Sequence, residues 1–424
     1  MKIVVVARSG SREVKIQTLP KGSKLREDDF MKCVAHWLLQ KQIVLSFQLI
    51  TILLLMDLWV PSLRPYMSKF FTLSYYNHSS EKYGMGYNDF YFIAFSIILL
   101  TGLRASCMKY ILAPLSRRWG VSKAKDATRF VEQGWMVMYY NMVWPLGMYL
   151  YYKSSYFLNM AELWTKWPQR ELDGLVKAYY LGQWFFWIQQ VLVINIEDRR
   201  KDYWQMLTHQ FVTIGLMTAS YACHLTNFGH LILVLMDVID LFLPLAKCLK
   251  YLGFTTICDV LLGCFIVSWL FARHLLFLKT CWSIYTDFPR IGPAGCCRGT
   301  AEDLQEPFPV PDDWSHLIEP FYDPVGTVCM NNNIMYSFLS FLLQLQVPMV
   351  LWFTIIARIA LQMLQGKRAE AIRSDGELDK ISENEQGEMR LPRIWLRRSA
   401  RTRYRRERQQ CAILQPPSSE RAIE

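Results

Sequence analysis

The chain has 424 residues, of which 52% are apolar and 14% aromatic, and its formal net charge is +11. The apolar residues are gathered in runs of near-membrane length, which is more apolar surface than a water-soluble core requires. Composition therefore excludes an ordinary soluble enzyme and predicts an all-α, polytopic membrane protein.

The N-terminal segment, residues 1–42, is charged and mixed. It lacks the short apolar core ending in small residues that marks a cleavable signal peptide. We expect this segment to be cytosolic and the first apolar run to act as an uncleaved anchor.

Apolar segments then recur at lengths that suit a bilayer crossing. The fifth is interrupted by Thr, Gln, Gly and Ser, so other helices rather than lipid are expected to surround it. The sequence predicts about eight transmembrane helices, at 43–60, 90–112, 133–152, 178–196, 204–222, 230–252, 256–278 and 334–364.

Charge sets the expected orientation, because basic residues favour the cytosolic side. The stretch 116–129 is basic and the loop 196–202 contains Arg199, Arg200 and Lys201, whereas the loop 279–333 is acidic. With both termini cytosolic, eight crossings place 279–333 in the lumen together with 61–89. The second loop holds a glycosylation sequon at Asn77, where we expect a glycan.

The luminal assignment has a consequence for cysteine. Cys281, Cys296, Cys297 and Cys329 share the 279–333 loop, so a disulfide among them is possible, but the sequence does not choose the pair. No CxxC or His/Cys spacing suggests zinc, and we predict no metal site.

The C-terminal tail, residues 367–424, contains the arginine-rich run 390–408. Beside a membrane span, such a run is more typical of contact with anionic lipid than of nucleic-acid binding. We expect a cytosolic, disordered tail and no nucleic-acid partner.

Polar residues within the fifth segment are the first candidate site. On one continuous helix from about Asp202, five polar side chains fall within an arc of roughly 60°. His209 would lie about 10 Å in from the cytosolic end. Such a stripe predicts a cavity inside the bundle, lined by Asp202, His209, Thr213, Ser220 and His224.

The sixth segment repeats the pattern, with Asp237, Asp240, Pro244, Lys247 and Tyr251 inside an arc of roughly 80°. Pro244 has no amide hydrogen, so the Asp240 carbonyl loses its helical partner. A structural clamp that pairs Asp240 with Lys247 or a neighbouring helix is the alternative. We favour a functional cavity opposite the histidine stripe.

Other polar groups receive structural interpretations. Arg273 and His274 end the seventh segment near the lumen, where snorkelling explains them. Interhelical hydrogen bonds are the expected role of Gln183, Gln189, Gln190 and Asn195.

The stretch 196–252, IEDRRKDYWQMLTHQFVTIGLMTASYACHLTNFGHLILVLMDVIDLFLPLAKCLKYL, resembles the signature region of the ceramide synthases, a branch of the TLC-domain family. The resemblance is strongest to fungal members and covers about 121–366. It implies a TLC domain at 121–366, a helical bundle around an intramembrane cavity, preceded by two spans at 43–115.

The resemblance also implies an activity and a location. The family resides in the endoplasmic reticulum membrane and transfers a fatty acyl group from acyl-CoA to the amine of a sphingoid base. Acyl-CoA is the co-substrate, and no other cofactor or metal is implied. A homodimer or a small single-span accessory subunit is the implied assembly.

By position, the resemblance assigns catalytic roles to His209, Asp237 and Asp240. The imidazole would act as general base or as nucleophile, and Asp240 could fix its tautomer. Basic residues at the cytosolic mouth would meet the CoA phosphates. Substrate-binding roles fall to Gln210, Thr213, Arg199, Arg200, Lys201 and Lys247.

The chain departs from the family at one position: Gln210 stands where the family has a second histidine. On a helix His209 and Gln210 would form two walls of one cavity, and glutamine takes up no proton near neutral pH. A working N-acyltransferase is the interpretation we favour. The alternatives are a weakened paralogue that protects against sphinganine-analogue toxins, and a non-enzymatic lipid-binding or lipid-sensing protein.

Overall fold

The structure is a computed structural model. It describes residues 27–121, 123–196, 203–292, 295–305, 307–311, 315–323 and 325–364. The chain divides into two compact units, Met1–Gln40 with Leu391–Glu424, and Lys41–Arg390. Of the first unit only residues 27–40 are described, and they are helical. The C-terminal tail lies outside the described residues.

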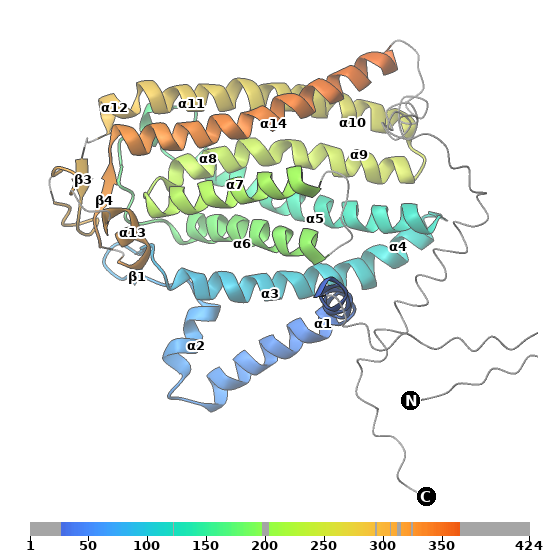
Figure 1. The fold of residues 1–424 in the computed structure, drawn as a ribbon, viewed down its shortest axis with the longest axis horizontal. Coiled ribbons are helices and arrows are strands. Elements are labelled where there is room, and N and C mark those ends of the chain that lie inside the picture. The colour runs from blue at the N-terminus through green and yellow to red at the C-terminus, as the bar shows by residue number, and fades with distance from the viewer. Residues whose placement is uncertain are drawn as a thin grey trace, which may run out of the picture. The chain divides into compact units, whose positions relative to one another are not determined.

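Long helices dominate the second unit, as the sequence predicts (Figure 1). α3 packs against α6, α5 against α8 and α9, α6 against α7, and α14 against α7 and α11. The main helices are α1 (Glu27–Trp59), α3 (Asp89–Cys107), α5 (Ala124–Lys153), α6 (Gly174–Ile196), α7 (Tyr203–Ala222), α8 (Thr226–Asp237), α9 (Phe242–Tyr251), α10 (Thr255–Ser268), α11 (Phe277–Thr286) and α14 (Asn332–Leu364).

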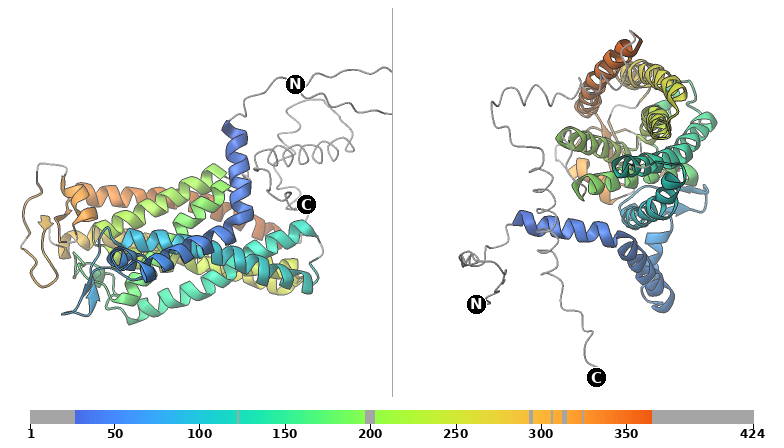
Figure 2. Two further views of the ribbon diagram at one scale, coloured as in Figure 1. Left: turned by 90° about the horizontal axis from the view of Figure 1, so that it is seen from below. Right: turned by 90° about the vertical axis from the view of Figure 1, so that its right-hand side faces the viewer.

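Short elements join some of these helices into longer rods (Figure 2). The π-helix η1 (Met108–Leu112) links α3 to α4 (Ala113–Arg118), and the 3-10 helix η3 (Val238–Leu241) links α8 to α9. The π-helix η4 (Trp269–Leu276) links α10 to α11. The remaining helices are α2 (Arg64–Phe71), η2 (Ala161–Leu163), α12 (Phe288–Ile291) and α13 (Ser315–Tyr322).

Four helical stretches among the described residues are long and apolar enough to cross a membrane: Trp37–Trp59, Asp89–Arg118, Thr255–Ile291 and Asn332–Arg358. The chain is therefore a multi-pass membrane protein. Helices also occupy the other four predicted segments, within α5, α6, α7 and α8–α9. On α6 protein contact replaces lipid contact at Tyr180, Leu181 and Phe186, which have no exposed surface. The total of eight crossings stays a prediction.

One end of the bundle, which we call the loop end, carries the short strands and the loops between rods (Figure 1). β1 (Tyr76–Asn77) pairs with β2 (Lys82–Tyr83), and β3 (Gly295–Cys297) pairs with β4 (Val328–Met330). Cys296 and Cys329 form a disulfide, which decides the pairing left open by the sequence, while Cys281 and Cys297 are free and buried.

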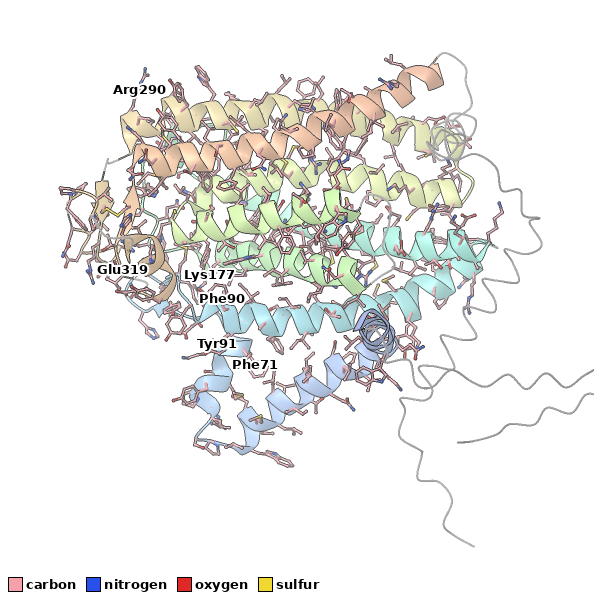
Figure 3. All side chains as sticks on the ribbon, viewed as in Figure 1. Phe71, Phe90, Tyr91, Lys177, Arg290 and Glu319 are labelled. Carbon is pink, nitrogen blue, oxygen red and sulfur yellow. A yellow bond between two sulfur atoms is a disulfide. The ribbon has the colours of Figure 1, made fainter. Side chains whose placement is uncertain are left out.

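Two cations fix the loop end to the helices. Arg170 donates from Nη2 to the carbonyls of Cys297, at 3.0 Å, and Gly326, at 2.9 Å. Lys177, at the start of α6, lies 2.7 Å from Asp89 of α3 and donates to the carbonyls of Ser74 and Gly84 (Figure 3). Asp89 also accepts from the Tyr221 hydroxyl, at 2.7 Å.

We expect Lys177→Met to destabilise the protein by about 3–5 kcal/mol, because it leaves the Asp89 carboxylate buried without its cation. Lys82→Met is the matched control. The Lys82–Asp173 pair is 4.0 Å apart with side chains 48% and 72% exposed, so its loss should cost about 0–1 kcal/mol. Thermal unfolding in detergent checks both, and equal effects would contradict the structural role of Lys177.

Candidate active site

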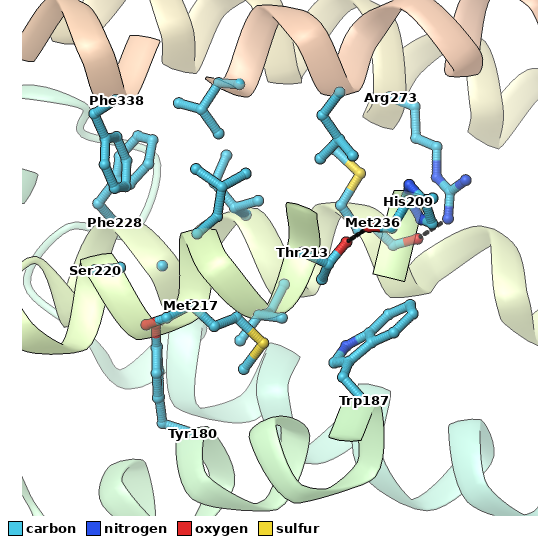
Figure 4. Close-up of a pocket in the computed structure, with 16 residues that line it drawn as sticks. Tyr180, Trp187, His209, Thr213, Met217, Ser220, Phe228, Met236, Arg273 and Phe338 are labelled. Atoms are coloured by element: carbon cyan, nitrogen blue, oxygen red, sulfur yellow. Dashed lines mark hydrogen bonds between the residues drawn. The ribbon is translucent and has the colours of Figure 1, made fainter. Parts of the chain in front are cut away.

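A cavity lies between α6, α7, α8, η4 and α14 (Figure 4). On α7 the lining residues His209, Thr213, Leu216, Met217 and Ser220 recur every three or four positions. One face of α7 therefore forms a continuous wall of the cavity.

The facing wall has the same helical origin. On α8 the lining residues are Phe228, Gly229, Ile232, Leu233 and Met236, again one face of the helix. Apart from its two ends, the wall is apolar. The cavity thus resembles a tube, with Tyr180, Phe228 and Phe338 at one end and Trp187, His209 and Arg273 at the other (Figure 4).

The histidine end centres on His209. Its ring meets Trp187 and Trp352 edge to face, with centroids 6.2 and 5.7 Å away. Thr213 donates its hydroxyl to the His209 carbonyl, at 3.0 Å. The imidazole Nδ1 is buried and makes no hydrogen bond within the described ranges. His209 therefore faces the interior, as the sequence predicts, and its Nδ1 is unpaired among the described residues.

Arg273 is the second group at this end. It comes from the eight-residue π-helix η4, an element that is rare and frequent at functional sites. Its Nη2 donates to the Met236 carbonyl, at 2.9 Å, and to the Asp240 carboxylate, at 3.3 Å. The guanidinium lies 4.7 Å from the Trp269 ring centroid and beside His209 (Figure 4).

The sequence interpretation of Arg273 as a snorkelling residue is wrong. The rod that carries it continues to Ile291, so Arg273 lies well inside the helix rather than at its end. A signal was present, because the apolar residues 275–278 follow Arg273 directly and extend the run past it. A cation followed by more apolar sequence must point into the bundle.

Three buried polar atoms around this end have no hydrogen-bond partner among the described residues: His209 Nδ1, Arg273 Nε and Trp187 Nε1. Buried polar groups in proteins are normally paired, so each such atom calls for an explanation. Their convergence at one end of an apolar tube fits a ligand with a polar reacting group and an apolar chain.

The two predicted aspartates do not meet at His209. Asp237 is fully buried and accepts a hydrogen bond from Gln183 of α6, which also contacts Tyr139 and Tyr179. Asp240 binds Arg273 instead, and the half-buried Lys247 lies close enough to interact with it electrostatically. The 3-10 helix between the aspartates breaks the continuous helix on which the predicted arc depends.

Asp240 therefore pairs with a neighbouring helix, as the structural alternative proposed, and its partner Arg273 lines the cavity. The expected Asp240–imidazole hydrogen bond is not formed. Gln183 and Asn195 make the predicted interhelical bonds, to Asp237 and Tyr203. For Gln189 that prediction is wrong, because both of its side-chain polar atoms are unpaired among the described residues.

Gln210 is buried, 3% exposed, and does not line the cavity. The expectation that His209 and Gln210 form two walls of one cavity is therefore wrong: on α7 the lining residues are His209, Thr213, Leu216, Met217 and Ser220. Ser220 does line the cavity, at the end far from His209, where its hydroxyl donates to the Leu225 carbonyl.

His224 does not lie on the polar helix face predicted for it. α7 ends at Ala222, and His224 has a φ of 53°, which turns its side chain into the loop end. There its Nδ1 lies 2.7 Å from the Gln169 carbonyl and its Nε2 3.5 Å from Arg170. Burial, with Arg170 adding to it, lowers the pKa of His224 to about 3, so this histidine stays neutral.

The predicted CoA-binding residues Arg199, Arg200 and Lys201, with Asp202, lie outside the described residues. Within the described ranges no cluster of three His, Cys, Asp or Glu side chains could share a metal ion. The assigned roles of His209, Asp237, Asp240, Gln210, Thr213 and Lys247 in a reaction stay predictions.

Comparison with known proteins identifies the family. The TLC-domain model matches residues 129–358, more than half of the chain and inside the predicted 121–366. The chain is 50% identical to a ceramide synthase of Gibberella moniliformis over 77% of each chain. It is 41% identical to a sphingosine N-acyltransferase-like protein of Alternaria alternata, over 80% of this chain and 76% of the relative.

A third relative, a sphingosine N-acyltransferase of Schizosaccharomyces pombe, is 37% identical over 80% of this chain and 79% of its own. The shared region covers most of each protein. The residues matched by the TLC-domain model include all those that line the cavity. The chain therefore belongs to the TLC-domain family, in the branch of the fungal ceramide synthases.

Proposed function

We propose that this protein is a sphingoid-base N-acyltransferase, which moves a fatty acyl group from acyl-CoA to the amine of sphinganine or a related base. The observation that carries the proposal is an apolar tube that ends at an unpaired imidazole beside a guanidinium. The similarity to a ceramide synthase and a sphingosine N-acyltransferase supports the same reaction.

The reaction breaks the thioester C–S bond, forms an amide C–N bond and moves one proton from the amine to the CoA sulfur. His209 can take that proton as general base and return it to the leaving thiolate. Alternatively, the imidazole attacks the thioester first and holds the acyl group until the amine displaces it. Either route requires a ring nitrogen that is free of other partners, and His209 Nδ1 is unpaired among the described residues.

Arg273 supplies the positive charge that either route needs. Attack on a thioester places negative charge on the carbonyl oxygen, and a donor held in place beforehand stabilises that charge. The Met236 carbonyl and Asp240 fix the guanidinium through Nη2. Arg273 is thus a catalytic residue in this proposal, and Asp240 is a positioning residue that acts through it.

The proposal rests on one histidine. Because Gln210 is buried away from the cavity, the family's second histidine position does not line the reaction site in this chain. A glutamine there keeps hydrogen-bonding capacity without a titratable proton. An active enzyme is therefore compatible with the substitution.

We place the protein in the endoplasmic reticulum membrane with its loop end in the lumen and its termini in the cytosol. The Cys296–Cys329 disulfide supports an oxidising compartment on that side. The Ser79 hydroxyl donates to Glu302, at 2.7 Å, which supports a common side for the two loops predicted to be luminal. A homodimer or a single-span accessory subunit rests on the family resemblance alone.

We expect His209→Ala to lower turnover of sphinganine and palmitoyl-CoA by about 10²–10⁴. Gln210→His should change turnover by less than about tenfold, because the side chain does not reach the cavity. His78→Ala, an exposed histidine, is the control. If the native protein is inactive and Gln210→His restores activity, the single-histidine account is contradicted. The native protein would then be a disabled synthase.

Arg273→Lys keeps the charge but loses the planar fork, so we expect kcat to fall by about 10²–10³ with little change in the KM for acyl-CoA. Asp240→Asn should lower kcat less, through loss of guanidinium placement. Arg290→Lys, on the exposed surface of the same rod, should have no effect. If Arg273→Lys keeps the kcat of the native protein, the guanidinium takes no part in the mechanism.

Asn77 is the only Asn-x-Ser/Thr asparagine in the sequence. Its Nδ2 donates to Glu171, at 2.7 Å, so the glycan must be added before this contact forms. We expect endoglycosidase H to shift the mass of the native protein and not of Asn77→Gln. An unshifted native protein would mean that Asn77 carries no glycan.

A further inference from the structure

We infer that the end of the cavity farthest from His209 sets the length of the acyl chain, with Phe338 of α14 as its main stop. This inference rests on the proposed function, because it assigns the tube to the fatty acyl group. At this end Phe338 packs edge to face on Phe228 of α8, with ring centroids 5.7 Å apart (Figure 4).

The side chains at the end of the cavity farthest from His209 have little room to move. A Cβ placed on Gly229 would lie 2.6 Å from the Ser220 hydroxyl and 2.7 Å from the Tyr180 hydroxyl. Both hydroxyls are held by hydrogen bonds, Ser220 to the Leu225 carbonyl and Tyr180 to the Met217 carbonyl. α6, α7 and α8 are therefore in close contact there, which leaves these side chains little room to move.

The length of the tube follows from helix geometry. His209 and Ser220 are eleven positions apart on α7, which is about 16 Å at about 1.5 Å per residue. An extended alkyl chain advances about 1.25 Å per carbon, given a C–C bond of about 1.5 Å. The tube thus holds about 13 carbons beyond the reacting carbonyl. This length matches a myristoyl group, and a palmitoyl group is two carbons longer. Lignoceroyl and hexacosanoyl groups exceed it.

The occupant is the acyl chain rather than the chain of the base. An acyl group is apolar from the carbon next to its carbonyl, and the wall beyond Thr213 offers the apolar side chains of Leu216, Met217 and Ile232. A sphingoid base carries hydroxyl groups beside its amine, and hydroxyls buried in such a wall would lack partners.

Two variants move the stop in opposite directions. Phe338→Ala removes a buried ring and lengthens the tube, whereas Ile232→Phe fills it part-way along. Exposed residues of α14 provide matched controls, Phe341→Ala, at 52% exposed, and Leu343→Phe, at 44% exposed. Each purified variant is assayed with sphinganine and acyl-CoAs from lauroyl to hexacosanoyl, and then with palmitoyl-CoA and bases of different chain length.

The native protein should turn over myristoyl-CoA best and palmitoyl-CoA next. Phe338→Ala should raise the ratio of lignoceroyl to palmitoyl turnover by about tenfold or more, Ile232→Phe should shift the optimum to lauroyl-CoA, and both controls should keep the native profile. Because each result is a ratio within one preparation, partial loss of folded protein does not obscure it.

Native acyl profiles in both cavity variants, with turnover intact, would overturn the inference alone. A shift confined to the base series would overturn it in favour of the base chain as occupant. No turnover by the native protein with any acyl-CoA would instead overturn the proposed function and the inference with it.

Discussion

A charged side chain inside a membrane-spanning bundle must be paired, and in this protein that constraint acts on Arg273. Arg273 is 8% exposed, and its guanidinium is held by Asp240, the Met236 carbonyl and the face of Trp269. These contacts join η4 to α8 and η3, and they aim the guanidinium at the cavity. The polar character of the reacting end follows from this arrangement.

The same constraint explains the irregular helices around the site. η4 is a π-helix and η3 a 3-10 helix, and each changes the rotation per residue where Arg273 and Asp240 must meet. Pro244 contributes by removing the amide that would otherwise bond the Asp240 carbonyl. The opposite end of the cavity is instead built from tight helix contact, because Gly229 lets α8 approach Ser220 and Tyr180.

Much of the fold could be predicted because long apolar runs and basic loops constrain a membrane protein strongly. Helices cover all eight predicted segments, and His209 faces the cavity. The site could be predicted only in part. Projection on an ideal helix placed Asp237 and Asp240 on one arc, but η3 directs Asp237 to Gln183 and Asp240 to Arg273.

His224 and Arg273 show the other limits of the sequence. The positive φ of His224 moves its side chain off the predicted polar face of α7, and no local sequence pattern predicts that turn. The predicted segment 256–278 ends too early and so puts Arg273 near a helix end, although the apolar residues that follow it argue for a longer rod. Gln210 could be recognised as unusual, but its direction away from the cavity required the packing of α7.

The most direct test of this account is an experimental structure of the protein with a non-reactive thioether analogue of palmitoyl-CoA. The account predicts the alkyl chain along α7 from His209 to Phe338, with the reacting carbon beside His209 and Arg273. An alkyl chain outside this cavity, or a reacting carbon far from both side chains, would contradict it.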